Sequence, residues 1–486
     1  MPRSRKRHAM LALVAVPAVL SAGLAVGLAI GASAGALGGE PITGEPLRDP
    51  PVLRSRDGRL AVTFTAKGAT TRIGGRRVVT WAYNGLAPGP TLEVRPGDRL
   101  QITNRNGLPG QPTNLHVHGM HVSPRGHGDN VFVNTPSGAT FVNRYDIPDD
   151  HIPGEYWYHP HRHMYVDQQV SAGMAGTIIV RGGWEDQPAL SSLRTRQMVL
   201  QQFQVTPDGQ VVRGTMTSDA PTYTYVNGQL KPVVDIRPGE LQRWRLSNLQ
   251  GDSFVRIRVP DGMRAWLIAT DGNPLARPQR VYEMLIPPAG RRTILVRAGA
   301  PGESVMRNEP WGTGFQAIPE QDLLTVRTAG PRRAGQGLPA RIGDMPNLRR
   351  AQVARRRTVQ FSMGAPGPNG MPVFLINGRR YEQWGRRNLA SMRLGTVEEW
   401  TLTNTTDEYH PFHIHLQPFQ VMSVNGQPVR GVMYRDTVPI PPMVNGVPGT
   451  VVIRQRYTDF TGRFVIHCHI LFHEDNGMMA PVQVVR

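Results

Sequence analysis

A segment built around an Asn-Gly pair occurs three times along the chain, and this repeat constrains the fold more than any other feature. Each copy runs from the pair through short apolar stretches to a second asparagine: Asn84 to Asn104, Asn227 to Asn248 and Asn377 to Asn404. The copies begin about 143 and 150 residues apart, which divides the 486 residues into three domains of one type. Asn-Gly is a strong signal for a tight hairpin turn, and no helical period is sustained between the turns. The repeat therefore predicts an all-β fold of antiparallel sandwich or small-barrel domains.

The three domains are expected at residues 57 to 183, 184 to 330 and 358 to 486. A chain of this length exceeds one ordinary domain, which agrees with three units of about 150 residues. Residues 331 to 357 are rich in Arg, Gly and Pro and lack strand patterning, so we interpret them as a linker.

The first 39 residues have the pattern of an export signal or an N-terminal anchor. A cationic start that includes Lys6 and Arg7 is followed by an apolar run over residues 10 to 31 and by small residues at 32 to 34. We therefore expect the protein outside the cytoplasm, as a secreted, periplasmic or cell-surface protein. Because the run is long for a signal peptide, it can instead remain as an anchor, and we expect membrane contact only in that case.

The formal net charge of +19 raises the question of a nucleic-acid partner. The excess consists almost entirely of arginine, since the only lysines are Lys6, Lys67 and Lys231, and it is dispersed along the chain. No recognition helix, zinc finger or aromatic-basic pattern accompanies it. We therefore interpret the charge as a solvated basic surface and expect no nucleic-acid binding.

Cys468 is the only cysteine, so it forms no intrachain disulfide. It lies within His467-Cys468-His469 and is followed by His473 and Met478. A thiolate, imidazole nitrogens and a distant thioether form the ligand set of a blue-copper electron-transfer site. On an extended segment the two flanking histidines face away from the cysteine, so the tripeptide can join that site to a second metal site. The alternative, a buried free cysteine beside unrelated histidines, is disfavoured by three further histidine motifs.

Histidine is confined to two regions of the chain. Apart from His8, eight histidines lie between residues 116 and 163 and six between residues 410 and 473, with some 246 consecutive positions empty between them. The metal chemistry is therefore expected in the first and third domains, and the middle domain is expected to be a spacer without metal ligands. Four motifs stand out: His116-Val-His118-Gly119, His159-Pro-His161, His410-Pro-Phe-His413-Ile-His415 and His467-Cys468-His469 with His473.

In this order, the four motifs resemble the signature of the multicopper oxidases, a family that includes laccases, bilirubin oxidases and bacterial cuprous oxidases. The resemblance covers roughly residues 57 to 486 and implies three consecutive cupredoxin-like Greek-key β-barrel domains. It also implies four copper ions: one of type 1, one of type 2 and two of type 3. Carried over motif by motif, the ligands are His410, Cys468, His473 and Met478 for type 1, His116 and His413 for type 2, His118, His159 and His469 for one type 3 ion, and His161, His415 and His467 for the other.

The resemblance further implies that a donor is oxidised one electron at a time while dioxygen is reduced to water. This reduction consumes protons, and Glu474 and Asp129 resemble the acidic residues that supply them in this family. We expect each to be buried near the metals with a raised pKa. The other histidines of the first region are interpreted as structural: His121, His127, His151 and His163. The exception to consider is His163, which lies two residues past His161 and can instead support a metal ligand.

The donor is less constrained than the chemistry. The chain has 19 methionines but no methionine-rich run of the kind that dedicated cuprous oxidases often carry, which favours a laccase-like oxidase of phenolic or aromatic donors. The alternative is an oxidase of Cu(I), Fe(II) or Mn(II). A copper nitrite reductase would leave His467 and His469 unexplained, and a copper-storage protein would be expected to have lost some of these ligands. We expect a monomer whose partners are dioxygen and a small donor.

Overall fold

The three Asn-Gly pairs form tight turns in a computed structural model that describes residues 37, 40–214, 221–314, 316–333, 336–366, 370 and 372–486. Asn84, Asn227 and Asn377 have φ angles of 53°, 53° and 49°, in the left-handed region that Asn tolerates and the following Gly readily adopts. Each Asn side chain also accepts a backbone hydrogen bond from a neighbouring strand, at 2.8 Å from Thr65 N, 2.8 Å from Val199 N and 2.7 Å from Gln360 N. The repeat thus places the same turn in each of three domains. Apart from residue 37, the predicted export segment lies outside the described residues.

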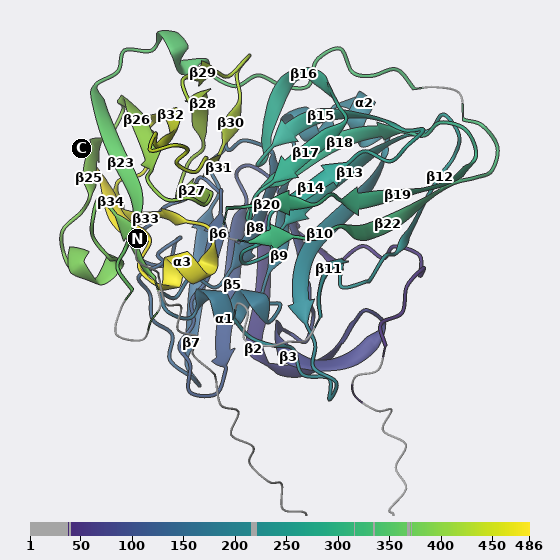
Figure 1. The fold of residues 1–486 in the computed structure, drawn as a ribbon, viewed down its shortest axis with the longest axis horizontal. Helices are drawn as coiled ribbons and strands as arrows, with labels where there is room; N and C mark the ends of the chain where they lie inside the picture. Colours follow the sequence, from purple (N-terminus) through teal and green to yellow (C-terminus); the bar gives the residue numbers. More distant parts are fainter. Residues whose placement is uncertain are drawn as a thin grey trace, which may run out of the picture. The chain divides into compact units, whose positions relative to one another are not determined.

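The elements follow the chain in three groups, whose colours run from purple and blue through teal to green and yellow in Figure 1. The first domain contains β1 (Val52–Arg54), β2 (Arg59–Ile73), β3 (Arg76–Tyr83), β4 (Thr91–Val94), β5 (Arg99–Gly107), β6 (His116–His118), β7 (Thr140–Asp146), β8 (Gly154–His159), α1 (Val166–Ser171) and β9 (Gly176–Val180).

The middle domain contains η1 (Gly183–Asp186), α2 (Pro188–Ser191), β10 (Arg194–Gln204), β11 (Thr222–Val226), β12 (Val233–Ile236), β13 (Leu241–Asn248), β14 (Val255–Arg258), β15 (Arg264–Thr270), β16 (Asn273–Val281), β17 (Glu283–Ile286), β18 (Arg291–Arg297), β19 (Gly302–Asn308), β20 (Trp311–Gly312), β21 (Ala317–Ile318) and β22 (Gln321–Thr328). The segment that follows contains η2 (Leu348–Arg350).

The third domain contains β23 (Arg355–Gly364), β24 (Val373–Ile376), η3 (Tyr381–Trp384), β25 (Ala390–Arg393), β26 (Val397–Asn404), β27 (His410–Ile414), β28 (Phe419–Val424), β29 (Gln427–Pro428), β30 (Tyr434–Arg435), β31 (Thr437–Ile440), β32 (Gly449–Arg456), β33 (Gly462–Cys468), α3 (Leu471–Asp475) and β34 (Met479–Val485).

Each domain consists of two main sheets that enclose a hydrophobic core, so the fold is all-β and cupredoxin-like, as predicted. In the first domain the sheets have the strand orders β3-β2-β5-β7 and β1-β4-β9-β8-β6. The middle domain has β11-β10-β13-β18-β15-β16 and β12-β22-β19-β14-β17. The third has a sheet built on β24-β23-β26-β32-β28-β29 and another of order β25-β34-β33-β27-β31.

The strand directions differ from the expectation of purely antiparallel sheets. In every domain the first long strand runs parallel to the strand that contains the repeated asparagine: β2 with β5, β10 with β13 and β23 with β26. These asparagines occupy equivalent registers, with Asn104 opposite Phe64, Asn248 opposite Leu200 and Asn404 opposite Phe361. A parallel pair needs a long crossover connection, and an alternating apolar pattern carries no information about such connections.

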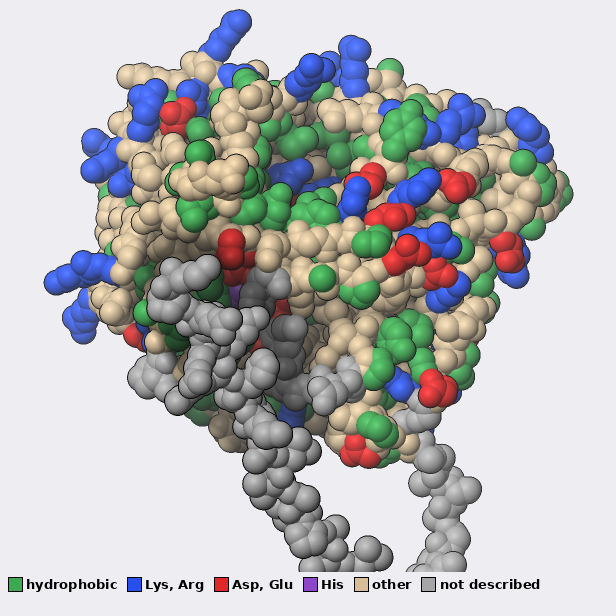
Figure 2. Space-filling model, in the orientation of Figure 1, with side chains coloured by type: hydrophobic (Ala, Val, Ile, Leu, Met, Phe, Trp, Pro, Cys, Tyr) green, Lys and Arg blue, Asp and Glu red, His purple; other side chains and the backbone are tan. Residues whose placement is uncertain are grey.

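On the face seen in Figure 2 the basic side chains are dispersed, as the sequence predicted. Figure 2 shows Lys and Arg spread across the visible face, with Asp and Glu interleaved among them. Within the described part of the chain, no helix combines the length and the apolar character that a membrane span requires.

Candidate metal centre

The histidine motifs meet because the strands that carry them are hydrogen-bonded in pairs. In the first domain β6 pairs antiparallel with β8, which places His116 opposite His159. In the third domain β27 pairs antiparallel with β33, which places His413 opposite His467 and Phe412 opposite Cys468. The rings of His116 and His413 are 5.9 Å apart, so the two pairs of strands bring one cluster of imidazoles together from two domains.

Cys468 lies at the centre of the first group of potential ligands. Its Sγ atom is 3.6 Å from His410 Nδ1 and 3.6 Å from His473 Nδ1, and all three side chains are buried. The second nitrogen of His410 lies 2.8 Å from the Thr406 hydroxyl, which fixes the orientation of that ring. Met478 is fully buried, and its carbonyl accepts a hydrogen bond from the N–H of Cys468 at 3.0 Å. Burial raises the pKa of the thiol, and a metal ion would stabilise the thiolate.

A second group consists of three imidazoles that face one another. The Nε2 atom of His161 lies 3.2 Å from those of His467 and His415, and the latter two are 3.3 Å apart. A neutral imidazole has one donor and one acceptor nitrogen, so three nitrogens at one point cannot satisfy one another fully. Such a cluster suits a metal ion, because each nitrogen can then donate its lone pair.

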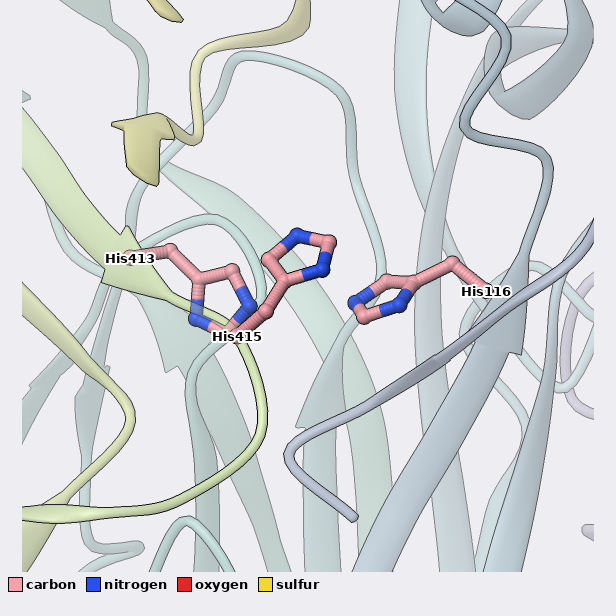
Figure 3. Close-up of side chains that lie close together, drawn as sticks. All are labelled: His116, His413 and His415. Carbon is pink, nitrogen blue, oxygen red and sulfur yellow. The ribbon is translucent and has the colours of Figure 1, made fainter. Parts of the chain in front are cut away.

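Other motif histidines of the two domains form two further groups beside these three imidazoles. Ligand nitrogens of His116, His118 and His159 lie within 4.8 Å of one another, as do those of His116, His413 and His415. Figure 3 shows that the rings of His413 and His415, in the third domain, face the ring of His116 in the first domain. The rings of His116 and His415 stack, with their centroids 4.0 Å apart.

The grouping differs in one respect from the expected ligand sets. His118, His159 and His469 were expected to share one ion, and the ring of His469 lies 5.0 Å from that of His118 and 5.6 Å from that of His159. Nitrogens of His118 and His159 group within 4.8 Å with one of His116, whereas no such group among the described residues includes His469. The ligand assignment of these histidines therefore remains a prediction.

Buried imidazole nitrogens that lack a hydrogen-bond partner indicate whether metal ions fit this cluster. Among the described residues, buried imidazole nitrogens without any hydrogen-bond partner include His116 Nε2, His118 Nδ1, His159 Nε2, His413 Nε2 and both nitrogens of His469. A buried polar atom without a partner costs about 1–3 kcal/mol, so this concentration at one place requires a ligand. Imidazole nitrogens and one thiolate are donors that copper prefers.

Asp129 holds one of these imidazoles. Both of its carboxylate oxygens lie 2.9 Å from His116 Nδ1, and it accepts a hydrogen bond from Val117 N at 3.0 Å. Burial raises the pKa of Asp129 to about 8, and the hydrogen bond from Val117 lowers it only in part. Burial and a raised pKa are both as the sequence predicted.

Glu474 is buried as expected, but the pKa of its carboxyl group moves in the other direction. Its Oε2 atom lies 2.9 Å from His467 Nδ1, and its Oε1 atom lies 3.4 Å from His161 Nδ1. Burial raises the pKa of Glu474, but the two imidazoles outweigh it and lower the value to about 2. The expected raised pKa is therefore wrong for Glu474, because the sequence does not reveal these contacts.

The other histidines are accounted for by hydrogen bonds, in agreement with structural roles. Their partners are Leu416 O and Asp459 for His121, Val142 O for His127, Ile152 O for His151 and Glu382 for His163.

Sequence reasoning missed Asp436, which lies between β30 and β31. Its Oδ1 atom is 3.1 Å from His118 Nε2, and its backbone carbonyl accepts a hydrogen bond from His413 Nδ1 at 2.7 Å. No motif marked this residue, because its contact with His118 spans 318 positions of the chain.

The metal-free protein is expected to lose stability as the pH falls below about 6.5. Burial lowers the pKa of nine of the cluster histidines, to about 3 for His159 and His410 and about 4 for His161. The unfolded chain then binds more protons than the folded one below pH 6.5, and one such histidine costs about 2 kcal/mol at pH 5. Buried carboxyl groups with a raised pKa act in the opposite sense, among them Asp129, Glu408, Asp436 and Asp475, but the nine histidines outnumber them.

Urea unfolding of chelator-treated protein at pH 7, 6 and 5 measures this effect. A free energy of unfolding that stays constant over this range would contradict it.

Comparisons with known proteins agree with this arrangement. Three models of a family described as multicopper oxidase match residues 65–184, 157–329 and 351–486. A laccase from Bacillus subtilis is 26% identical over 467 residues, which cover 83% of this chain and 90% of that protein. The multicopper oxidase MmcO from Mycobacterium tuberculosis is 28% identical over 482 residues, covering 89% and 88%. The structure of a multicopper oxidase from Campylobacter jejuni, described as a metallo-oxidase, is similar with a TM-score of 0.80 and 26% identity, covering 93% of this chain and 98% of that one.

Proposed function

Because the chain belongs to the multicopper oxidase family and is thus a copper oxidoreductase that uses oxygen, we propose that it couples four one-electron oxidations of a phenolic or aromatic donor to the reduction of dioxygen to water. The cofactors are four copper ions: one of type 1, one of type 2 and two of type 3. Bound copper supplies the electron transfer and the oxygen chemistry. The protein supplies the ligands, orients them and provides protons.

We assign the ligands by motif, with support from the buried groups described above. The type 1 ion takes His410, Cys468, His473 and Met478. The type 2 ion takes His116 and His413, and the type 3 ions take His118, His159 and His469, and His161, His415 and His467.

The observation that carries the proposal is the peptide bond between His467 and Cys468. Cys468 belongs to the group with His410 and His473, whereas His467 belongs to the group with His161 and His415. One bond therefore joins a mononuclear site to the imidazole cluster. This is the connection that an oxidase needs between the place where a donor loses an electron and the place where oxygen is reduced.

The surroundings of His473 support a phenolic donor. Phe374 stacks on the His473 ring at 4.0 Å, and the Oε1 atom of Glu408 lies 3.5 Å from His473 Nε2. Burial, with a smaller contribution from Asp407, raises the pKa of Glu408 to about 7. The Glu408 carboxylate, buried beside the ring of His473, can accept the proton that a phenol releases when it loses an electron.

A metal ion is the second candidate donor. The similar structure from Campylobacter jejuni is described as a metallo-oxidase, and Asp407 and Glu408 offer adjacent carboxylates of the kind that bind Fe(II) or Mn(II). Cu(I) prefers methionine ligands. In the third domain Met422, Met433 and Met443 are half-buried and occur singly rather than as a methionine-rich run.

Oxygen uptake by the copper-loaded protein distinguishes the two donors. We expect kcat/KM for a methoxylated phenol to exceed that for Cu(I) or Fe(II) by at least about tenfold. Glu408→Gln should lower kcat/KM for the phenol by about 10²-fold through loss of the proton acceptor. Asp407→Asn is the matched control, since this exposed neighbour should matter little for a phenol.

A faster rate with a metal ion, lowered by both substitutions, would instead support the metal oxidase. Nitrite turnover without oxygen uptake would overturn both readings.

We propose that the protein works outside the cytoplasm. The cationic start, the apolar run and the small residues at 32 to 34 support export. N-terminal sequencing of the protein recovered from its native compartment tests this, and a cytoplasmic protein that retains residue 1 would contradict it.

A further inference from the structure

Asp436 holds one imidazole from each of the two histidine-bearing domains. Its carboxylate contacts His118 Nε2 of the first domain, and its backbone carbonyl accepts a hydrogen bond from His413 Nδ1 of the third domain. The opposite nitrogens, His118 Nδ1 and His413 Nε2, are buried and have no hydrogen-bond partner among the described residues. One residue therefore determines which nitrogen of each ring is left for the metal.

Asp436 is in turn held by an arginine from the middle domain. Arg291, the first residue of β18, donates to Asp436 through two nitrogens, Nη1 to Oδ1 at 2.8 Å and Nη2 to Oδ2 at 2.6 Å. A forked pair of this kind fixes the carboxylate in both position and plane. Arg291 is 1% exposed, so water neither competes for Asp436 nor screens the ion pair.

The same guanidinium group also reaches the first domain. Its Nε atom donates to the carbonyl of Glu155 at 3.3 Å, and Nη1 donates to Ala289 O at 2.9 Å. Glu155 belongs to β8, the strand that ends at His159. Arg291 therefore contacts all three domains at the point where the imidazoles converge.

Gly119 explains how the ion pair fits beside the first histidine motif. It directly follows His118 and has a φ angle of +81°. A Cβ atom at this position would lie 2.2 Å from Asp436 Oδ2 and 2.9 Å from Arg291 Nη2. The ion pair occupies the space that only a glycine leaves, so the motif and the pair are built to pack together.

We propose that Arg291 is a positioning residue for the copper centre, supplied by the domain that has no histidine. It holds the Asp436 carboxylate so that this group accepts the hydrogen bond from His118 Nε2 and leaves Nδ1 free to bind the metal. The middle domain is therefore more than the spacer that the histidine map predicted. This role rests on the proposed function, because the metal is taken to be copper.

Copper titration of the metal-free protein against a competing chelator tests this role. Partners that orient a metal-binding imidazole typically contribute 10–100-fold in metal affinity. Arg291→Lys keeps the positive charge but cannot form both hydrogen bonds to the carboxylate. The type 2 and type 3 ions, which we call the trinuclear copper, should therefore bind about 10–100-fold more weakly. The blue absorption of the type 1 ion should remain, because neither Arg291 nor Asp436 belongs to the Cys468 group.

Arg243→Lys is the matched control. Arg243 is also a buried arginine of the middle domain and forms an ion pair with Glu185 at 2.9 Å. It hydrogen-bonds to Thr195 and Glu185, and neither of these residues is a motif histidine or a copper ligand. A general weakening of the middle domain would affect both variants, whereas the proposed role predicts selective loss of trinuclear copper in Arg291→Lys alone.

Asp436→Asn provides an independent test, which also applies if Arg291→Lys fails to fold. The amide has nearly the same shape but lacks the charge, and the same selective loss of trinuclear copper is expected. If Arg291 acts through Asp436, the double variant should bind copper no more weakly than Asp436→Asn alone.

Wild-type affinity in Arg291→Lys or Asp436→Asn, or equal loss of the type 1 ion, would overturn the role of Arg291. A wild-type protein that binds fewer than about four copper ions would contradict the proposed function instead.

Discussion

Replacing Cys468 by serine is expected to reduce donor oxidation to the uncatalysed background and to remove one of about four copper ions. The Sγ atom is the only thiol sulfur in the chain and lies 3.6 Å from the ring nitrogens of both His410 and His473. A serine hydroxyl stays protonated at neutral pH and is a poor ligand for copper, whereas the thiolate defines the blue site. Because Cys468 forms no disulfide, the substitution should leave the fold intact.

The measurement is a visible absorption spectrum with copper analysis and steady-state oxygen uptake. Cys468→Ser should lose the blue band and retain about three copper ions, because the orphaned imidazole nitrogens of the cluster are unchanged. Met478→Leu is the matched control: it changes another buried residue of the same core, and loss of a weak axial ligand should alter the potential while donor oxidation continues. Undiminished donor oxidation by Cys468→Ser would show that electrons enter elsewhere.

Most of the Cys468 group could be predicted because Cys468, His473 and Met478 are close in sequence, whereas His410, 58 positions away, was assigned through the family resemblance. Cys468 and His473 lie five positions apart, and the turn into α3 brings them together without long-range information. His410 comes from another strand, but the pairing of β27 with β33 aligns its motif with Cys468. The Asn-Gly turns were predictable for the same reason, since Asn84 and Gly85 adopt their positive φ angles locally.

The residues that hold the imidazoles in place, Asp436 and Arg291, could not be predicted in this way. Asp436 contacts His118 across 318 positions and Arg291 across 145. Such contacts depend on how whole domains pack, which neither motif spacing nor alternation records. The low pKa of Glu474 was missed for the same reason, because it follows from the imidazoles of His161 and His467 on either side of one carboxylate.

The opposite pKa shifts of the two carboxyl groups predict different roles for them. Asp129, whose pKa is raised to about 8, carries a proton at neutral pH and can donate it beside His116. Glu474, whose pKa is lowered to about 2, is ionised and acts as an acceptor that orients His467. Proton supply for the reduction of dioxygen should therefore depend more strongly on Asp129.

Asp129→Asn is expected to lower kcat by about 10²–10⁴-fold, the usual contribution of a positioned acid. The amide can still accept the hydrogen bond from Val117 N, but it replaces one of the two oxygens beside His116 Nδ1, so kcat is measured on copper-saturated protein. Glu474→Gln is the matched comparison. It should mainly weaken copper binding, by about 10–100-fold, because Glu474 orients an imidazole ligand.

The pH profile of kcat separates these two roles. A donor with a raised pKa works only while it is protonated, so wild-type kcat should fall as the pH rises through the pKa of Asp129. The positive charge of bound copper moves that pKa downward, which puts the falling limb at or below about pH 8. Asp129→Asn should lack this limb, whereas Glu474→Gln, once saturated with copper, should retain it. A limb that persists in Asp129→Asn and vanishes in Glu474→Gln would assign proton supply to Glu474 and overturn the division of roles.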